Sequence, residues 1–387
     1  MSDSTIEGRS MHQGALLEAD SLTQEFALES NAQGSTYSST RIRSMMETRG
    51  NFSSEVEFEI ECSKDHWSLV TCSSTDEEEE EESSRDVFEK LKKHPQWGWF
   101  FWEGGDRLEI GGKIAEGGQA EIFEARLLPE FSVQEESRHE DKLLVLKVFK
   151  GGYCLRDLQK QWPLGMFQST THECCPPVIG GTLLKDGRFG FVMKKCWGDL
   201  RKLIDMRMEQ KKNLGPPFPF EKAREFMWYI AFWIQGLLKR DILHRDVKAS
   251  NVLISTEQDL RNFDPEFGHS FIYVADFECS MGVLGTTFWR APEILLSLRD
   301  RNTTLELCTE KTDVYSYAMT CYEIVTGRIP FEGRSPSNYN IVLSGQRPKL
   351  PNDLDSRVKE LIMRCWHQDP IQRPTFTEVI KFWKNWK

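Results

Sequence analysis

Short stretches in which apolar and polar residues alternate follow one another between residues 106 and 196. Glycine and aspartate separate these stretches, which read RLEIGGKI, EIFEARLL, KLLVLKVFK, VIGGTLL and RFGFVMKKC. A period of two places successive side chains on opposite faces of a strand, so the region is predicted to form an antiparallel sheet of about five strands. The stretch CLRDLQKQW predicts one short helix within this region.

The pattern becomes helical after residue 198. Four stretches are each long enough for an amphipathic or buried helix, and they read FEKAREFMWYIAFWIQGLLKR, DVYSYAMTCYEIVTG, SRVKELIMRCW and TFTEVIKFWKNW. A small β-rich part followed by a larger helical part predicts an α+β protein of two lobes with a cleft between them.

Residues 1–95 have a different composition. They are rich in Ser, Thr and Glu, contain the run DEEEEEE at 76–82, and hold 9 Lys and Arg against 21 Asp and Glu. A segment so polar and self-repelling cannot bury a core, so it is predicted to be a disordered acidic tail. The alternating stretch EVEFEIEC at 55–62 is interpreted as a local extended stretch or, alternatively, as a docking segment.

The aromatic run WGWFFW at 97–102 changes the composition sharply, because so many rings in one place call for burial. The folded part is therefore predicted to begin at 96, with a β-rich lobe at 96–195 and a helical lobe at 196–387. Polar stretches at 128–141 and 255–270 are predicted to be surface loops.

Charge and cysteine usage exclude several classes of function. The formal net charge of -11 lies in the tail, and the near-neutral remainder offers no electrostatic footprint for nucleic acid or an anionic membrane. No apolar run approaches the roughly 20 residues that a membrane span needs. The 10 cysteines form no CxxC pair. Reduced thiols in the cytosol or the nucleus are expected.

The stretch HRDVKASN at 244–251 carries the strongest chemical signal. Phosphoryl transfer needs a carboxylate that accepts a hydroxyl proton, a cation that neutralises the moving phosphoryl group and an oxygen ligand for magnesium. Asp246, Lys248 and Asn251 could supply all three from one loop. In these residues the chain resembles the eukaryotic protein kinases, and the resemblance covers residues 106–385.

The resemblance implies a bilobal protein-kinase fold with ATP and Mg²⁺ as cofactors. Lys147 in VLKVFK would pair with the α- and β-phosphates of ATP, and Asp276, which opens DFE, would ligate Mg²⁺ together with Asn251. Glu278 stands where the family has glycine. Because glycine gives the backbone its freedom, Glu278 is expected to alter switching more than metal binding.

The stretch GTTFWRAPE at 285–293 indicates the acceptor. In the serine/threonine kinases that the chain resembles, a threonine at the place of Thr286 hydrogen-bonds the catalytic Asp and Lys, which implies a Ser or Thr acceptor. Ser280 and Thr287 are candidate phosphorylation sites or plain loop residues. A phosphate on either could pair with Arg245.

Other matches to the family are structural. Glu293 in APE and Arg373 in DPIQRP match a buried ion pair, and Asp313 matches the residue that holds the catalytic-loop backbone. WRAPE combined with CWHQDPIQRP looks most like the tyrosine-kinase-like branch of the serine/threonine kinases.

The nucleotide-covering loop departs from the family's G-x-G-x-x-G, in which the absence of side chains lets backbone amides approach phosphates. In IAEGGQAEIF, Ala115 and Ala120 occupy the first and third glycine positions and leave Gly117 and Gly118. Weaker nucleotide affinity is expected. The resemblance also assigns Ile122, in the same stretch, to the nucleotide site.

At the lobe junction, FVMKKCWGDL, the resemblance places Met193 behind the adenine base and the backbone of Lys195 and Cys196 along its edge. Asp199 is a candidate contact for the ribose.

The family also pairs the strand lysine with a glutamate on the following helix, and YCLRDLQKQWP contains none. Asp157 is the preferred substitute for that glutamate. Gln159 could hydrogen-bond Lys147 but not neutralise it, and Glu173 lies beyond a proline.

These features together predict an ATP- and magnesium-dependent serine/threonine protein kinase in intracellular signalling, with protein substrates and a tail that could dock a partner. The alternative is a pseudokinase that acts as a nucleotide-binding scaffold or allosteric switch, which Ala115, Ala120 and Glu278 favour. A different nucleotide-dependent transferase ranks third. The enzyme is preferred because all five polar groups of the phosphotransfer site are present.

Overall fold

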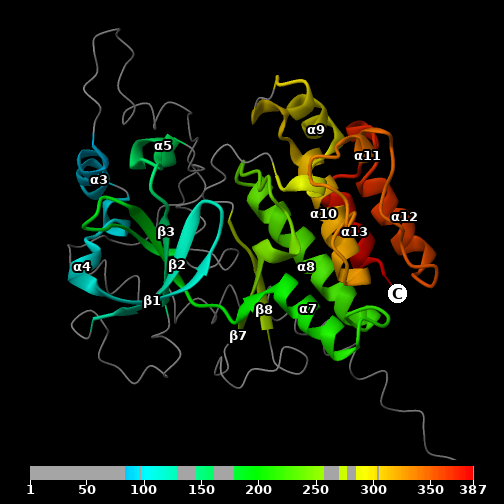
Figure 1. Cartoon of the computed structure of the whole chain (residues 1–387), viewed down its shortest axis with the longest axis horizontal. Helices are drawn as coiled ribbons and strands as arrows, with labels where there is room; N and C mark the ends of the chain where they lie inside the picture. Colours follow the sequence, from blue (N-terminus) through cyan, green and yellow to red (C-terminus); the bar gives the residue numbers. More distant parts are fainter. Residues whose placement is uncertain are drawn as a thin grey trace, which may run out of the picture. The chain divides into compact units, whose positions relative to one another are not determined.

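The computed structural model describes residues 83–95, 97–128, 144–160, 178–256, 270–276, 285–302 and 305–386 (Figure 1). The predictions for residues 55–62, Glu173, Glu278 and Ser280 lie outside these ranges. Most of the two polar stretches predicted as surface loops lies outside them as well.

The β-rich lobe contains a five-stranded antiparallel sheet in the order β1-β2-β3-β5-β4 (Figure 1). Its strands are β1 Leu108–Glu116, β2 Ala120–Leu127, β3 Leu144–Phe149, β4 Val178–Leu183 and β5 Phe189–Lys194. Each strand coincides with one of the five alternating stretches, so the predicted sheet is confirmed. The short helix predicted between the third and fourth strands is α5, Leu155–Lys160.

The strand register decides which side chains share a face of this sheet. Ala115 pairs with Ile122, and Ile122 pairs with Lys147. Directly opposed residues point to the same side, so these three side chains lie in one row. The opposite face carries an apolar cluster that consists of Trp102, Leu108, Ala125, Leu144, Leu146, Val148 and Val192.

The predicted boundary between the disordered tail and the folded lobe is wrong, because a helix lies before it. The structure places α3 at Ser84–Lys92, within the segment expected to be disordered. Val87, Phe88 and Leu91 of this helix are buried, and the rings of Phe88 and Phe101 lie 6.2 Å apart between centroids. The helix was missed because the average composition of residues 1–95 is dominated by polar residues and by the run of glutamates just before α3. The few apolar residues of α3 have helical spacing but change that average little.

Several rings of the aromatic run after α3 are buried, as predicted: Phe100, Phe101 and Trp102 are buried, whereas Trp99 is exposed. The end of the run adds to the edge of the sheet. Phe101 forms a parallel bridge with Gly181, and the backbone N–H of Trp102 donates to the Gly181 carbonyl oxygen at 3.1 Å. A Cβ atom at Gly180 would collide with the Trp102 indole, so this close approach needs glycine. Residues on both sides of 96 therefore belong to one folded lobe.

We expect Phe88→Ala to lower the free energy of unfolding by about 3–5 kcal/mol, the usual cost of truncating a buried phenylalanine. Urea unfolding of the full chain measures the change. Phe232→Ala is the matched control, because the Phe232 side chain is exposed and its truncation should cost clearly less. Unfolding midpoints that are the same for wild type and Phe88→Ala would show that α3 is not docked.

The helical lobe contains seven α-helices and a small sheet within the described residues. The helices are α7 Leu200–Gln210, α8 Phe220–Leu238, α9 Pro292–Arg299, α10 Glu310–Thr326, α11 Asn340–Leu343, α12 Ser356–Cys365 and α13 Phe376–Lys384. The sheet has the order β6-β7-β8, with β6 Gly198–Asp199, β7 Val252–Thr256 and β8 Ser270–Val274. The four predicted helices are α8, α10, α12 and α13, whereas α7, α9 and α11 were not predicted.

Short helical turns complete the described structure. They are η2 Gly98–Phe100, α4 Gly104–Arg107, η5 Ala249–Asn251, η6 Thr287–Trp289, η7 Leu305–Leu307 and η8 Pro370–Gln372. Two of them, η5 and η6, lie in the loops that the sequence singled out for chemistry.

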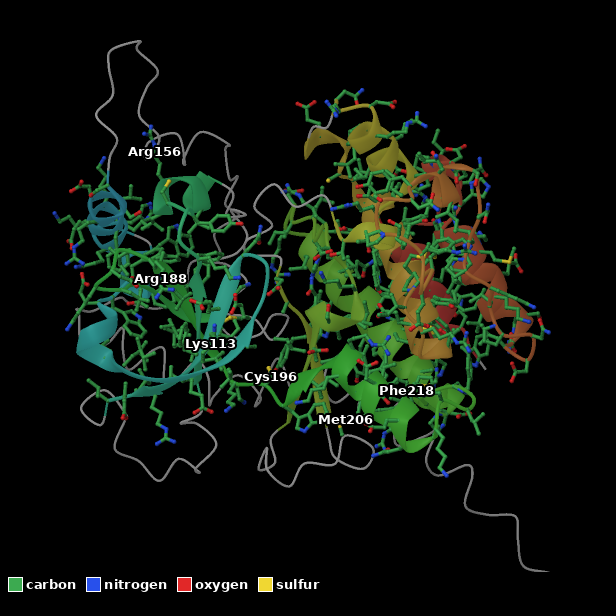
Figure 2. The ribbon with its side chains drawn as sticks, viewed as in Figure 1. Lys113, Arg156, Arg188, Cys196, Met206 and Phe218 are labelled. Carbon is green, nitrogen blue, oxygen red and sulfur yellow. The ribbon has the colours of Figure 1, made fainter. Side chains whose placement is uncertain are left out.

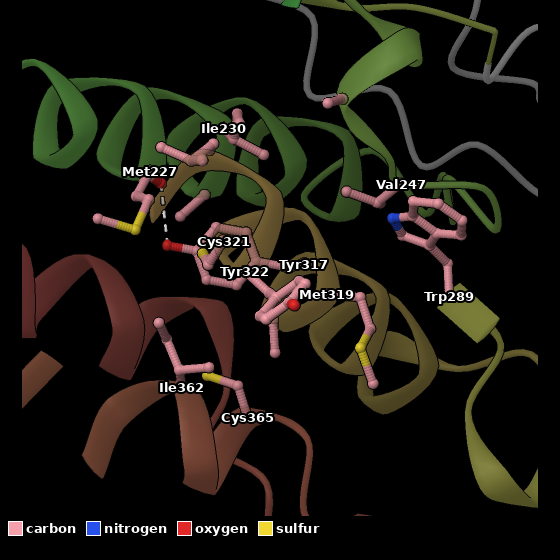
Figure 3. Close-up of a cluster of buried hydrophobic side chains, with 14 of the residues drawn as sticks. Met227, Ile230, Val247, Trp289, Tyr317, Met319, Cys321, Tyr322, Ile362 and Cys365 are labelled. Atoms are coloured by element: carbon pink, nitrogen blue, oxygen red, sulfur yellow. Dashed lines mark hydrogen bonds between the residues drawn. The ribbon is translucent and has the colours of Figure 1, made fainter. Parts of the chain in front are cut away.

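Helix α10 is the buried centre of this lobe. Figure 3 shows Tyr317 of α10 near Met227 of α8, and the Tyr317 hydroxyl donates to the Met227 carbonyl oxygen at 3.0 Å. The same helix holds both functional loops, because the Ser316 hydroxyl donates to the Trp289 carbonyl oxygen at 2.8 Å and the Thr320 hydroxyl donates to the Val247 carbonyl oxygen at 3.2 Å. The two loops therefore rest on one rigid element.

Candidate active site

Asp246, Lys248 and Thr286 form a closed set of hydrogen bonds. Lys248 Nζ donates to Asp246 Oδ2 and to Thr286 Oγ1, both at 2.7 Å, and Thr286 Oγ1 donates to Asp246 Oδ1 at 2.6 Å. The hydrogen bonds predicted for Thr286 are thus present. Charge assistance strengthens such bonds, so the carboxylate is held firmly beside an ammonium group and a hydroxyl.

Asn251 is oriented by the same carboxylate. Its Nδ2 donates to the Asp246 carbonyl oxygen at 2.8 Å and to Asp246 Oδ2 at 3.2 Å, and the residue is buried. Because the amide nitrogen faces Asp246, the amide oxygen remains as the atom that could ligate a hard cation.

A buried carboxylate below the loop fixes its backbone. Asp313 of α10 accepts hydrogen bonds from the backbone N–H groups of His244 and Arg245, both at 2.8 Å. This is the role predicted for Asp313. Burial raises the pKa of Asp313, although its bonds from His244 and Arg245 act in the opposite direction. The buried His244 ring contacts the Ala275 carbonyl oxygen at 2.8 Å, which ties the loop to the segment that precedes Asp276.

Lys147 and Asp276 come together in this structure. Lys147 Nζ donates to Asp276 Oδ1 at 2.8 Å, with the lysine side chain 9% exposed and the aspartate side chain 52% exposed. Burial raises the pKa of Asp276, but the charge of Lys147 and its hydrogen bond outweigh this effect and the net shift is downward. The candidate phosphate ligand and the candidate magnesium ligand thus meet in a single ion pair.

The helical partner expected for Lys147 cannot be assigned. Helix α5 contains both Asp157 and Gln159, but their side chains lie outside the described part, and so does Glu173. The choice among these three residues stays a prediction.

The nucleotide-covering loop is the turn between β1 and β2. The Gly117 N–H donates to the Ala120 carbonyl oxygen at 2.8 Å, and Ala120 is buried at the start of β2. A Cβ atom at Gly118 would meet no atom within 4 Å. The protein atoms around this turn would therefore tolerate a side chain at position 118. A ligand bound close to the backbone would be the reason for glycine there. The contacts predicted for Ala115, Gly117 and Ile122 with a nucleotide stay predictions.

The segment after β5 leads to the helical lobe, and Figure 2 labels Cys196 on it. Met193 is buried, and the Lys195 side chain donates to Glu124 Oε1 at 2.6 Å, which leaves the backbone as the part of Lys195 that could meet a base. Asp199 caps helix α7, because its Oδ1 accepts from the Lys202 N–H at 2.9 Å. A ribose contact would compete with this cap.

Arg245 has spare hydrogen-bonding capacity. Its Nε is buried and has no hydrogen-bond partner among the residues that the structure describes. Thr287 is the first residue of η6, in the stretch GTTFWRAPE. Pairing of Arg245 with a phosphate on Thr287 stays a prediction.

The ion pair predicted between Glu293 and Arg373 is present. Arg373 Nη1 and Nη2 donate to Glu293 Oε1 and Oε2 at 2.7 and 2.8 Å, and the Arg373 side chain is fully buried. The pair joins the first turn of α9 to the segment before α13.

Glu323 of α10 is a functional residue that the sequence reasoning missed. Its Oε2 accepts from the Ala249 N–H at 3.1 Å and from Trp289 Nε1 at 2.9 Å, and Arg201 Nη1 donates to its Oε1 at 3.2 Å. One buried carboxylate thus joins the catalytic loop to the stretch WRAPE. A glutamate inside the apolar helix stretch CYEIVTG was the available signal.

Glu323 should also make stability depend on pH. Burial raises its pKa from 4.5 to about 7, against the opposing effects of Ala249, Arg201 and Trp289. A carboxyl group with a raised pKa binds its proton more tightly in the folded state, so its stabilising contribution is complete below pH 4.5 and is lost as the pH rises to about 7.

As the pH rises through this window, we therefore expect the free energy of unfolding of wild type to fall by up to about 3 kcal/mol relative to that of Glu323→Gln. Urea unfolding at a series of pH values measures it. Glu360→Gln, at an exposed carboxyl, is the control and should follow the wild-type curve. A constant difference between wild type and Glu323→Gln would contradict the raised pKa.

Sequence comparison with known proteins also identifies the chain as similar to protein kinases. The family model described as protein tyrosine and serine/threonine kinase matches residues 108–382. A light-sensor protein kinase of Ceratodon purpureus is 32% identical over 233 residues, which are 54% of this chain and 18% of that protein. Serine/threonine-protein kinase STY46 of Arabidopsis thaliana is 27% identical over 282 residues, 71% of this chain and 43% of that protein.

Dual specificity protein kinase pyk3 of Dictyostelium discoideum is 32% identical over 180 residues, 46% of this chain and 12% of that protein. The chain therefore spans less than half the length of each of these three relatives. No helix among the described residues combines the length and apolar character needed to cross a membrane.

Proposed function

Because the chain belongs to the protein tyrosine and serine/threonine kinase family, we propose that it transfers the γ-phosphate of ATP to serine and threonine hydroxyls of protein substrates. The closed hydrogen-bond set of Asp246, Lys248 and Thr286 carries this proposal. It presents a proton acceptor and a cation at one point, which is the arrangement that phosphoryl transfer requires.

Each polar group has a separate task in the proposed reaction. The Asp246 carboxylate accepts the proton of the substrate hydroxyl, and Thr286 and Lys248 hold that carboxylate in place. The Lys248 ammonium offsets the negative charge of the phosphoryl group in transfer. Asp313 and Glu323 keep the loop backbone fixed, so that little reorganisation is needed during the reaction.

The residues present fit ATP with Mg²⁺. ATP supplies the phosphoryl group, and Mg²⁺ prefers hard oxygen ligands, which the Asn251 amide and the Asp276 carboxylate provide. Lys147 lies beside Asp276 and on the same sheet face as Ala115 and Ile122. These residues would hold the phosphates between the sheet and the metal ligands.

The choice of acceptor is tested with one peptide made with Ser, Thr or Tyr at a single position. We expect the purified full chain, given labelled ATP and Mg²⁺, to label the Ser and Thr versions at least about tenfold faster than the Tyr version, a difference of about 1.4 kcal/mol in the barrier. This comparison matters because pyk3 is named a dual-specificity kinase. Equal labelling of all three peptides would reject the proposed restriction to Ser and Thr.

A pseudokinase scaffold is the second candidate. Ala115 and Ala120 in the nucleotide-covering loop favour it, and so does the pairing of Lys147 with Asp276, which occupies both groups with each other. The intact set around Asp246 favours the enzyme. We also propose that the protein acts in signalling in the cytosol or the nucleus, with the tail before residue 83 as a docking segment for a partner.

A further inference from the structure

The helical lobe contains a basic groove whose lining residue Phe331 contacts Phe288 of the stretch GTTFWRAPE. A cavity of about 310 Å³ lies between the end of α10 and the segment before α12, and Arg328, Arg334, Arg347 and Lys349 line it together with a single carboxylate, Glu332. A second cavity of about 430 Å³ shares Arg334, Ile341 and Gln346 with the first, so the two form one continuous groove.

One of the four cations is structural. Arg347 is half-buried and donates to the carbonyl oxygens of Trp366, Val342 and Gln346 and to Gln368 Oε1, at 2.7 to 3.3 Å. These bonds occupy its guanidinium and fix the floor of the groove. Arg347 therefore shapes the groove and has little capacity left for a ligand.

The other three cations are exposed and have no acidic partner within the described part of the chain. The side chains of Arg328, Arg334 and Lys349 form no ion pair with any described carboxylate. Three unpaired cations around a groove with one carboxylate give it a positive potential, which is complementary to an acidic segment.

The groove is connected to the phosphotransfer loop through one aromatic contact. Phe331, which lines the first cavity, lies 5.1 Å from Phe288 between ring centroids. Phe288 belongs to η6, which follows Thr286 directly, and Thr286 Oγ1 bonds the Asp246 carboxylate. The groove is thus joined, through Phe331 and Phe288, to the loop that carries Thr286.

We infer that this groove binds an acidic segment of the protein substrate and selects substrates with carboxylates a few residues from the acceptor hydroxyl. The inference rests on the proposed function and specifies its substrate class. An extended chain advances about 3.3 Å per residue, so two or more carboxylates of one segment could meet Arg334, Lys349 and Arg328 in turn. Exposed charge pairs of this kind mainly set selectivity and association rate, and salt screens them.

The test uses two pairs of serine peptides. In each pair, one peptide carries acidic residues and the other carries the isosteric Asn and Gln. The acidic residues lie N-terminal to the acceptor serine in one pair and C-terminal to it in the other. For wild type at low salt we expect the acidic peptide on one side to have a KM about tenfold lower at similar kcat, and the advantage to shrink at high salt. Arg334→Glu/Lys349→Glu should lose that advantage, and Arg334→Lys/Lys349→Arg should keep it.

Lys185→Glu/Lys239→Glu is the matched control, because it makes the same change in net charge at two exposed lysines outside the groove. Its preference for the acidic peptide should remain. An equal loss in this control, or no acidic preference in wild type on either side, would overturn the inference.

A second readout separates this inference from the proposed function. Binding of a fluorescent acidic peptide without a hydroxyl acceptor, measured by anisotropy with the Asp246→Asn chain, does not depend on catalysis. Turnover of the neutral peptide with no acidic preference would overturn the groove alone. Salt-sensitive binding that the Glu pair at 334 and 349 abolishes, without any turnover, would support the groove and reject the kinase activity.

Discussion

Asp246→Asn is expected to reduce phosphoryl transfer by about 10²- to 10⁴-fold, the usual contribution of a positioned general base. Asparagine keeps the size of the side chain, and its amide oxygen can still accept from either Thr286 or Lys248, which bond different oxygens of Asp246. Its amide nitrogen only donates, so the side chain cannot take the hydroxyl proton. Transfer of labelled γ-phosphate to a serine peptide, with magnesium present, measures the loss. Thermal unfolding should change little, because the loop is held mainly through Asp313 and Glu323.

Asp353→Asn serves as the matched control, since Asp353 is an exposed carboxylate in the segment before α12. It should retain the wild-type rate. If wild type and Asp246→Asn are equally silent after preparation in both phosphorylated and unphosphorylated forms, the pseudokinase becomes the favoured function. If both are equally active, Asp246 is not the proton acceptor.

Arg373→Met is expected to lower the free energy of unfolding by about 3–5 kcal/mol, because it leaves the Glu293 carboxylate without its buried partner. Arg373 also donates to the His367 and Lys311 carbonyl oxygens, and these groups would lose a bond as well. Urea unfolding of the full chain, followed by a probe of the helical lobe, measures the effect.

Arg299→Met provides the comparison, because the Arg299 pair with Asp300 is exposed and such pairs contribute less than about 1 kcal/mol. The double variant Glu293→Gln/Arg373→Met should recover part of the loss, since no uncompensated charge remains. Equal destabilisation by Arg373→Met and Arg299→Met would show that the pair adds no more than a surface contact.

Local periodicity accounts for the parts of the fold that were predicted well. Helices α8, α12 and α13 repeat their apolar residues at the spacing of one buried face, and that spacing is a property of the chain itself. Helix α10 and strands β4 and β5 are buried on more than one side and were predicted from their apolar runs. Helices α3 and α7 were missed because each places only a few apolar residues on its buried side and carries many charges elsewhere. Their stability comes from the surfaces they cover.

The candidate site also contains residues that the sequence indicated and one that it did not. Asp246, Lys248 and Asn251 lie within one loop, so their spacing in the sequence was enough to indicate their chemistry. Glu323 lies 74 residues from the Ala249 amide that it accepts from, and its apolar surroundings in CYEIVTG indicate burial but not which groups it meets. Only the burial of α10 makes its carboxylate a link between two loops.

The sequence alone indicated the candidate reacting groups, the two lobes, and the order along the chain of the five strands and of helices α8, α10, α12 and α13, because short-range spacing encodes these. The tertiary structure decided which distant groups meet: Lys147 with Asp276, Phe331 with Phe288, and three cations around one groove. Such meetings depend on packing between elements far apart in the chain, and packing leaves no fixed spacing in the sequence.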